Sequence, residues 1–86
     1  MCVSGVIEQS LGGSGVGVVK KPKIEFGQTF RRIPTFAAAL SYVFLSTSGG
    51  YAYAKVEDIH VTNSSAVVKI AGTRCNYAYV NWIACL

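Results

Sequence analysis

The sequence predicts an all-β fold, a six-stranded antiparallel β-sandwich formed by a single domain of residues 1–86. Three observations indicate this fold. Short segments in which apolar and polar residues alternate are separated by clusters of Gly, Ser, Asn and Pro. Aromatic and β-branched residues, which favour strands, are common in these segments. No segment shows the sustained 3.6-residue period of an amphipathic helix.

The first two strands flank a long connection. Residues 3–9 form a short alternating segment, and the Gly-rich residues 10–22 follow it as a flexible loop. Residues 23–30 alternate again, and Pro34 then marks the start of the next strand, because proline cannot donate a hydrogen bond to a sheet ladder. The remaining strands of the domain therefore lie within residues 23–86.

The third strand, residues 35–45, is ambiguous from sequence alone. Its run of three alanines favours a helix, whereas its aromatic residues and valine favour a strand. Alternation in phase favours a strand, with one face formed by Phe36, Ala38, Leu40, Tyr42 and Phe44. The small residues on the other face, Ala37, Ala39 and Ser41, would allow another backbone to approach closely.

The second half of the chain contains three more expected strands. Residues 46–50 form a loop, and the fourth strand follows at residues 51–62. Its alternation changes phase near Glu57 and Asp58, which indicates a β-bulge there. A short fifth strand covers residues 66–71, and a turn then leads into the final strand at residues 76–86.

Both faces of the final strand carry residues that we expect to be buried. Its even-numbered residues Ala78, Val80, Trp82 and Ala84 are expected to pack between the sheets. The opposite face carries Tyr77, Tyr79, Asn81, Ile83 and Cys85. We expect Tyr51, Tyr79 and Asn81 to contact a neighbouring subunit. An obligate oligomer is also indicated by composition, with 51% hydrophobic and only 14% charged residues.

Several classes of protein are excluded by composition and motifs. The longest apolar run is about half of what a membrane span needs, and no secretory signal begins the chain. The net charge of +4 comes largely from two short basic clusters, which no nucleic-acid-binding motif accompanies. The Gly-rich loop lacks the Gly-Lys-Ser/Thr ending of a phosphate loop and the third glycine of a dinucleotide fingerprint. No cofactor is expected.

The three cysteines, Cys2, Cys75 and Cys85, are odd in number and lack the spacing of metal ligands. Cys75 and Cys85 lie at opposite ends of one expected strand, too far apart to bond to each other. We therefore expect three free thiols, in a chain made in a reducing cytoplasm.

Catalysis is not expected. Asp58 and His60 would share a face on a regular strand and resemble a general base with its orienting carboxylate, but no recognisable nucleophile accompanies them. The four carboxylates of the chain form no spaced glycosidase pair. A weak hydrolase that uses these two residues is the least favoured of three hypotheses.

A carbohydrate site is the favoured hypothesis. Aromatic rings bind sugars by packing against C–H groups, while amides and guanidinium groups bond to the hydroxyls. These groups occur at strand ends in Tyr53, Arg74, Asn76 and Tyr77. Carboxylates in the expected bulge, Glu57 and Asp58, could accept hydrogen bonds from sugar hydroxyls.

Four segments, in order along nearly the whole chain, resemble the H-type lectin domain. They are Ser4-Gly5-Val6-Ile7, then Ile24-Glu25-Phe26 through Phe30 with Ile33-Pro34, then Val56 through Asn63, and finally Trp82-Ile83-Ala84. The resemblance implies a six-stranded sandwich that assembles as a trimer or a pair of trimers. It also implies that sugars of the N-acetylgalactosamine type bind in clefts between subunits.

Similar domains end the tail fibres and tailspikes of bacteriophages. That setting fits this chain better than a secreted lectin does, because the secreted members have a signal peptide and a cysteine bridge. The family's sugar-binding arginine and tyrosine correspond in register to Tyr53 and Asn76 here. The last hairpin is shorter, so the family's tryptophan-histidine pair has no counterpart.

The sequence thus predicts a carbohydrate-binding module at the receptor-recognition end of a phage tail fibre or tailspike, located in the virion and made in the bacterial cytoplasm. Its expected partners are two further copies of the chain and a bacterial surface glycan, with no nucleic acid and no membrane insertion. The alternative is a structural trimerisation cap without a ligand. Sugar binding, if present, is expected around residues 74–77.

Overall fold

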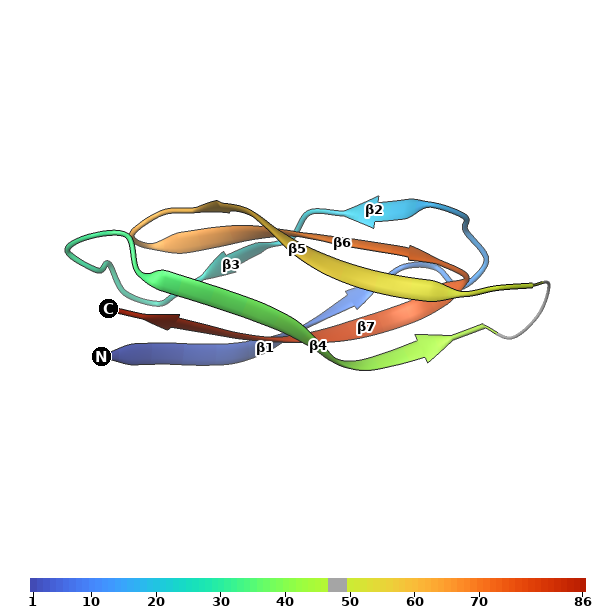
Figure 1. Ribbon diagram of the computed structural model, residues 1–86, viewed down its shortest axis with the longest axis horizontal. Helices are drawn as coiled ribbons and strands as arrows, with labels where there is room; N and C mark the ends of the chain where they lie inside the picture. Colours follow the sequence, from blue (N-terminus) through green and yellow to red (C-terminus); the bar gives the residue numbers. More distant parts are fainter. Residues whose placement is uncertain (47–49) are drawn as a thin grey trace.

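The computed structural model describes residues 1–46 and 50–86, with the exception of the side chain of residue 59. All secondary structure in this part of the chain is β, and all paired strands are antiparallel. The strands form two sheets that run along the long axis of a molecule measuring 48 × 18 × 15 Å (Figure 1). The prediction of an all-β antiparallel fold is confirmed.

The first sheet, called sheet A here, has the strand order β1-β7-β4. Its strands are β1 (Cys2–Ser10), β7 (Cys75–Cys85) and β4 (Thr35–Leu45). The last strand of the chain is therefore the centre of this sheet, and the first strand pairs with it over nine residues. Both chain termini consequently lie at the same end of the molecule (Figure 1).

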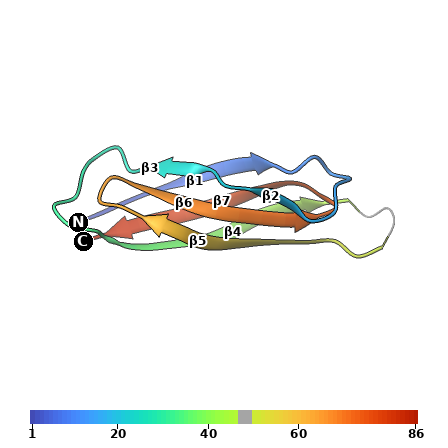
Figure 2. The ribbon, with the colours of Figure 1, turned by 90° about the horizontal axis from the view of Figure 1, so that it is seen from above.

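The second sheet, sheet B, is centred on β6 (Ser65–Thr73). One edge of β6 pairs with β5 (Tyr53–Val61), and the other edge pairs with two short strands in succession, β2 (Val18–Lys20) and β3 (Lys23–Glu25). Figure 2 shows β2 and β3 one after the other beside β6. The two sheets enclose the core between β6 and β7.

The core is formed by the inward faces of the two central strands. Val68 and Ile70 on β6 and Val80 on β7 have no exposed surface. Trp82 is 9% exposed and packs its ring against Phe26 and Phe36, with ring centres 5.6 and 6.3 Å apart. The prediction that the even-numbered residues of the final strand pack between the sheets is confirmed.

The strand count differs from the prediction, because residues 1–46 and 50–86 contain seven strands instead of six. The additional strand, β2, lies inside the expected loop at residues 10–22 and pairs with β6. The expected strand at residues 23–30 ends at Glu25, since Gly27 has a φ of 79° that interrupts the extended backbone. Phe26 and Phe30 are nevertheless buried, and their amides donate hydrogen bonds to the carbonyls of Ser64 and Asn63.

Residues 35–45 form a strand, as predicted, but its face assignment was partly wrong. The pairing of β4 with β7 shifts between Leu40 and Tyr42, which indicates a bulge at this point. Phe36, Ala38 and Leu40 therefore face the core, whereas Tyr42 and Phe44 are 53% and 46% exposed on the outer face. A one-residue shift exchanges the two faces of a strand, because the side chains alternate with a period of two.

The other strand boundaries agree more closely. A register shift between Asp58 and His60 confirms the bulge expected in the fourth strand. The fifth expected strand extends beyond residues 66–71 at both ends, to Ser65 and Thr73. The loop expected at residues 46–50 lies mostly outside the described residues. The described part of the chain has no helix long and apolar enough to span a membrane.

The expectation of three free thiols was wrong. Cys2 and Cys85 form a disulfide, and only Cys75 is free and buried. The physical reason is the register of β1 against β7, which pairs the first residue of one strand with the last residue of the other. The geometric argument against a Cys75–Cys85 bond was correct, but it said nothing about Cys2.

Candidate functional site

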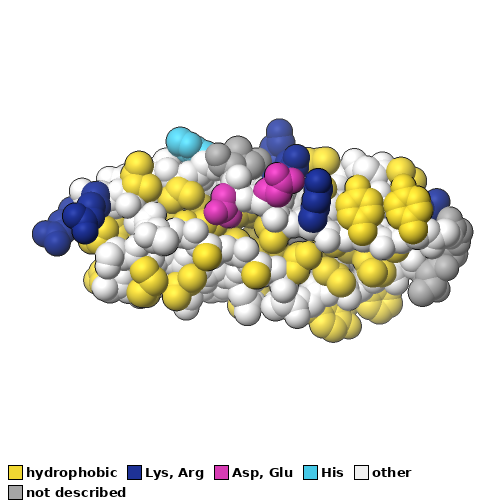
Figure 3. Space-filling view, in the orientation of Figure 1, with side chains coloured by type: hydrophobic (Ala, Val, Ile, Leu, Met, Phe, Trp, Pro, Cys, Tyr) yellow, Lys and Arg dark blue, Asp and Glu magenta, His cyan; other side chains and the backbone are white. Residues whose placement is uncertain are grey.

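The pole opposite the chain termini carries two exposed tyrosines. Tyr51 precedes β5 and Tyr53 begins it, and they are 69% and 40% exposed. Their ring planes differ by only 9° and their centres are 6.3 Å apart. This separation is within the range of parallel rings that are offset from each other. Figure 3 shows large hydrophobic side chains in this part of the surface, with acidic side chains farther along β5.

Arg74 contacts Tyr51, one of the two rings. Its guanidinium carbon lies 5.7 Å from the centre of the Tyr51 ring, within the range of a cation–π interaction. Its Nη1 donates a hydrogen bond of 3.0 Å to the carbonyl oxygen of Tyr51. The structure places no carboxylate of the described residues within ion-pair distance of this guanidinium. We call Tyr51, Tyr53 and Arg74 the tyrosine platform.

The backbone of Arg74 is fixed by the turn between β6 and β7. Its φ of 54° places it in the left-handed region, the only non-glycine residue of the described chain there. Its amide donates to the carbonyl of Gly15 at 2.8 Å, and its carbonyl accepts from the amide of Ser46 at 2.7 Å. The guanidinium therefore projects from a rigid turn.

The Gly-rich loop lies against the same turn. The amides of Leu11 and Gly13 donate to the carbonyls of Asn76 and Cys75. Thr73, 1% exposed, accepts a hydrogen bond of 2.9 Å from the amide of Gly17 through its hydroxyl. Thr73 pairs with Tyr53 in the sheet register, so this contact fixes the loop beside the platform.

Asn76 does not reach the platform. A side chain added at Gly13 would collide with the Asn76 amide oxygen, so the loop passes directly over this residue. Asn76 is consequently half-buried between the loop and β7, and its predicted role in sugar binding has no support in this geometry.

Tyr77 lies in a different cluster, on the outer face of sheet A. Its ring centre is 5.5 Å from that of Phe44, 6.0 Å from that of Tyr42 and 5.7 Å from that of Tyr79. Desolvation raises the pKa of the Tyr77 hydroxyl, and the neighbouring phenol of Tyr42 raises it further. We call Tyr42, Phe44, Tyr77 and Tyr79 the aromatic cluster.

Glu57 and Asp58 lie farther along β5, on sheet B. Glu57 forms ion pairs with Lys55 and Lys69, with oxygen–nitrogen distances of 3.5 and 3.7 Å. Asp58 is exposed beside the bulge. The Glu57 carboxylate is thus already engaged by lysines, which leaves it less available to sugar hydroxyls. His60 is exposed as well.

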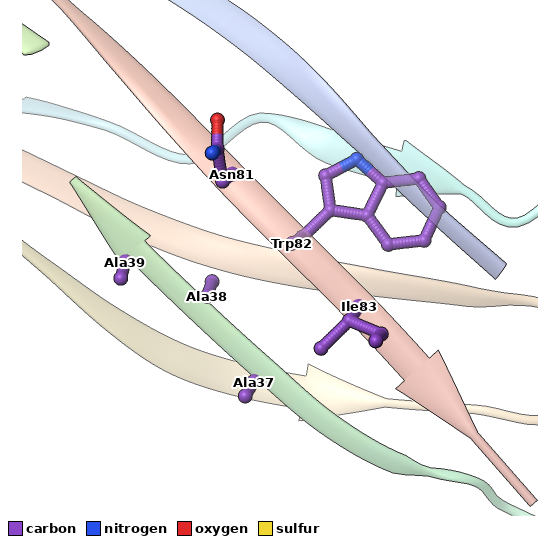
Figure 4. A pocket seen from close by; sticks show the side chains of 6 residues that line it. All are labelled: Ala37, Ala38, Ala39, Asn81, Trp82 and Ile83. Carbon is purple, nitrogen blue, oxygen red and sulfur yellow. The ribbon is translucent and has the colours of Figure 1, made fainter. Parts of the chain in front are cut away.

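A shallow groove runs along the outer face of sheet A beside the aromatic cluster. It has a volume of about 210 Å³, and it is lined by Ala37, Ala38, Ala39, Asn81, Trp82 and Ile83. Figure 4 shows the short alanine side chains of β4 beside the longer side chain of Ile83 on β7. Asn81, predicted to contact another subunit, is exposed in this groove.

The structure thus divides the predicted sugar-binding residues among four places. It brings Arg74 to Tyr51, which the sequence had assigned to a subunit interface, and the ring of Tyr51 neighbours that of Tyr53. The two-residue spacing of Tyr51 and Tyr53 was the available signal for this pair. No signal connected them with Arg74, because the turn that brings them together lies twenty residues later.

Within residues 1–46 and 50–86, no group of three or more His, Cys, Asp or Glu side chains is placed to hold a metal ion. No protein-family model matches the sequence. No curated protein matches it either. The resemblance to H-type lectins therefore remains an expectation from the four ordered segments alone.

Proposed function

We propose that this chain is a carbohydrate-binding module and that its sugar site is the tyrosine platform. The observation that carries the proposal is the pair of Tyr51 and Tyr53 rings, which are exposed, nearly parallel and centred 6.3 Å apart. Such a surface can pack against the C–H face of one or two consecutive sugar rings.

Arg74 supplies the polar part of the recognition. One of its N–H groups bonds to the Tyr51 carbonyl, and a guanidinium has five N–H donors in total. The remaining donors can bond to sugar hydroxyls at the edge of the rings. Because its backbone is held by two hydrogen bonds, little conformational entropy is lost when a ligand binds.

The proposed setting is the receptor-contacting end of a bacteriophage tail fibre or tailspike, with a bacterial surface glycan as the ligand. This part of the proposal rests on the resemblance of the four ordered segments. The position of the platform is consistent with it, since the platform lies at the pole opposite the two chain termini (Figure 1).

An array of bacterial capsular and O-antigen oligosaccharides, with N-acetylgalactosamine included, tests the proposal. We expect binding by the wild-type chain and at least a tenfold loss in Y53A, which removes one ring of the platform. Soluble monovalent sugars identified on the array should give the same ranking by calorimetry. The matched control is Y79A, which removes a tyrosine from the outer face of sheet A and should leave the affinity for a monovalent sugar, measured by calorimetry, unchanged.

A structural cap without a ligand is the second candidate. The aromatic cluster favours it, because large exposed aromatic residues are typical of protein interfaces. This candidate predicts that a folded, assembled wild-type protein binds nothing on the array. It also predicts that Y53A and R74A change neither folding nor assembly.

A further inference from the structure

The outer face of sheet A is an extended apolar surface that nothing in the described part of the molecule covers. Its exposed hydrophobic residues come from all three strands, and they are Val6, Tyr42, Phe44, Tyr79 and Ile83. Glu8 is the only charged residue of β1, β4 and β7. The outer face of sheet B differs, since it carries Lys23, Glu25, Lys55, Glu57 and Lys69.

We propose that the outer face of sheet A binds the same face of a second copy of this chain, with a twofold axis that runs along β7. A cyclic trimer would require two different complementary faces on each subunit. The charged outer face of sheet B is a poor complement for an apolar one. Sheet A therefore finds its best partner in another sheet A.

The shape of the outer face of sheet A supports this pairing. Across the sheet, Val6 on β1 aligns with Asn81 on β7 and Ala39 on β4. The β1 side is raised by Val6, while the β4 side is the groove over the alanines. A twofold axis along β7 places β1 of one copy over β4 of the other. Each valine then meets the alanine groove of the opposite copy.

The same axis gives a hydrogen-bond partner to Glu8, the one charged residue on the face. Glu8 aligns with Tyr79 and Tyr42 across the sheet. The rotation places Glu8 of one copy over Tyr42 of the other, where the phenol can donate a hydrogen bond to the carboxylate. The arrangement leaves no carboxylate facing another carboxylate.

The size of the face is adequate for a specific interface. Three strands of 9 to 11 residues form a surface of roughly 33 by 14 Å, by the standard strand rise and spacing. With its projecting side chains, this face offers on the order of 600 Å² per copy, the lower end of specific interfaces. Sheets packed face to face keep their strands within about 30° of each other, which this twofold arrangement permits.

A substitution in the groove tests the inference. Light scattering and sedimentation should give the wild-type chain a mass twice its 9.2 kDa. A39R places a long charged side chain in the groove and should reduce the mass to that of one chain. The matched control, V19R, makes a comparable change on the outer face of sheet B, where Val19 is 47% exposed, and should leave the dimer intact.

A second pair of variants tests the axis. Y42F removes the phenol that donates to Glu8 of the opposite copy. In a double-mutant cycle, E8Q and Y42F should each weaken the dimer, whereas the double variant should be no weaker than either single variant. This comparison also decides the matter if A39R fails to fold, which circular dichroism would reveal. A wild-type chain that is monomeric or trimeric at all concentrations overturns the inference, as does a dimer that A39R, E8Q and Y42F all leave intact.

The inference is separable from the proposed function. Y53A should weaken sugar binding at least tenfold without changing the mass, and A39R should abolish the dimer without changing the affinity for a monovalent sugar. If both proposals hold, the axis along β7 places the two platforms at the same pole. The wild-type dimer should then bind a multivalent glycan surface about 10²-fold or more tightly than A39R does.

Discussion

Gly5 on β1 lies directly against the indole ring of Trp82. A Cβ atom added at Gly5 would lie 2.9 Å from both Cζ2 and Nε1 of this ring. The two residues are paired across the sheet, and the indole of the central strand extends over the neighbouring strand. The absence of a side chain at Gly5 thus makes room for the largest residue of the core.

Substituting Gly5 with alanine should destabilise the protein by about 1–3 kcal/mol, because the added methyl group forces the Trp82 ring to shift in a filled core. Urea denaturation followed by tryptophan fluorescence measures the change. The matched control is S4A at the exposed neighbouring position, which should stay within about 0.5 kcal/mol of the wild type. Equal stabilities of the two variants would contradict this account of the core.

The Cys2–Cys85 disulfide closes a loop of 83 residues in sequence separation. A variant with both residues changed to serine should lose about 4 kcal/mol of unfolding free energy, because the unfolded chain regains the entropy of the open loop. Urea denaturation with and without a reducing agent tests this. The reducing agent should destabilise the wild type and leave the double variant unchanged; a wild type insensitive to reduction would argue against the disulfide.

Cys75 should be unreactive in the folded protein. Burial raises the pKa of its thiol above the ordinary 9.0, so little thiolate forms at neutral pH, and the side chain is only 1% exposed. Titration with a thiol reagent should find no reactive group in the native protein. In denaturant without reductant, one group should react. Rapid modification of the native protein would show that the β6–β7 turn opens easily.

Thr73 should be sensitive to loss of its hydroxyl. The T73V variant keeps the shape of the side chain but removes the acceptor for the Gly17 amide, at a cost of about 1–3 kcal/mol. Hydrogen exchange should show faster exchange of the Gly17 amide. T73S keeps the oxygen and should retain the slow exchange. Unchanged exchange in T73V would mean that this hydrogen bond does not hold the Gly-rich loop.

The aromatic cluster should make stability depend on pH at alkaline values. The pKa of the Tyr77 hydroxyl is raised above its ordinary 10.0 by desolvation first and by neighbouring Tyr42 second, so the folded state holds this proton more tightly than the unfolded chain does. The resulting stabilisation is fully present below pH 10 and is lost as the pH rises through the folded-state value. Urea midpoints of wild type and Y77F should therefore converge or cross above pH 10. A constant difference between the urea midpoints of the two proteins up to pH 11 would contradict this prediction.

Local alternation was sufficient to predict the class of fold and the core strand. The pattern of Ala78, Val80, Trp82 and Ala84 identified the inward face of the final strand without knowledge of its partners. The same reasoning was wrong for Tyr42 and Phe44, because a single bulge reverses the faces, and nothing in the local sequence marks it.

The sequence patterns could not predict contacts between distant segments of the chain. The disulfide depends on the pairing of the first strand with the last, which is a property of the whole topology. The platform depends on the left-handed backbone at Arg74, which orients its side chain toward Tyr51. Arginine at such a position is not suggested by residue type, since glycine and asparagine are the residues that favour this conformation.

The disulfide at the paired chain ends also determines how the protein responds to mechanical force. Because Cys2 and Cys85 are next to the two termini, tension applied between the ends passes through one covalent bond. The hydrogen bonds between β1 and β7, which would otherwise be pulled apart in succession, carry almost none of it. An oxidised molecule stretched by its ends should extend by only a few residues at forces that unravel the reduced one.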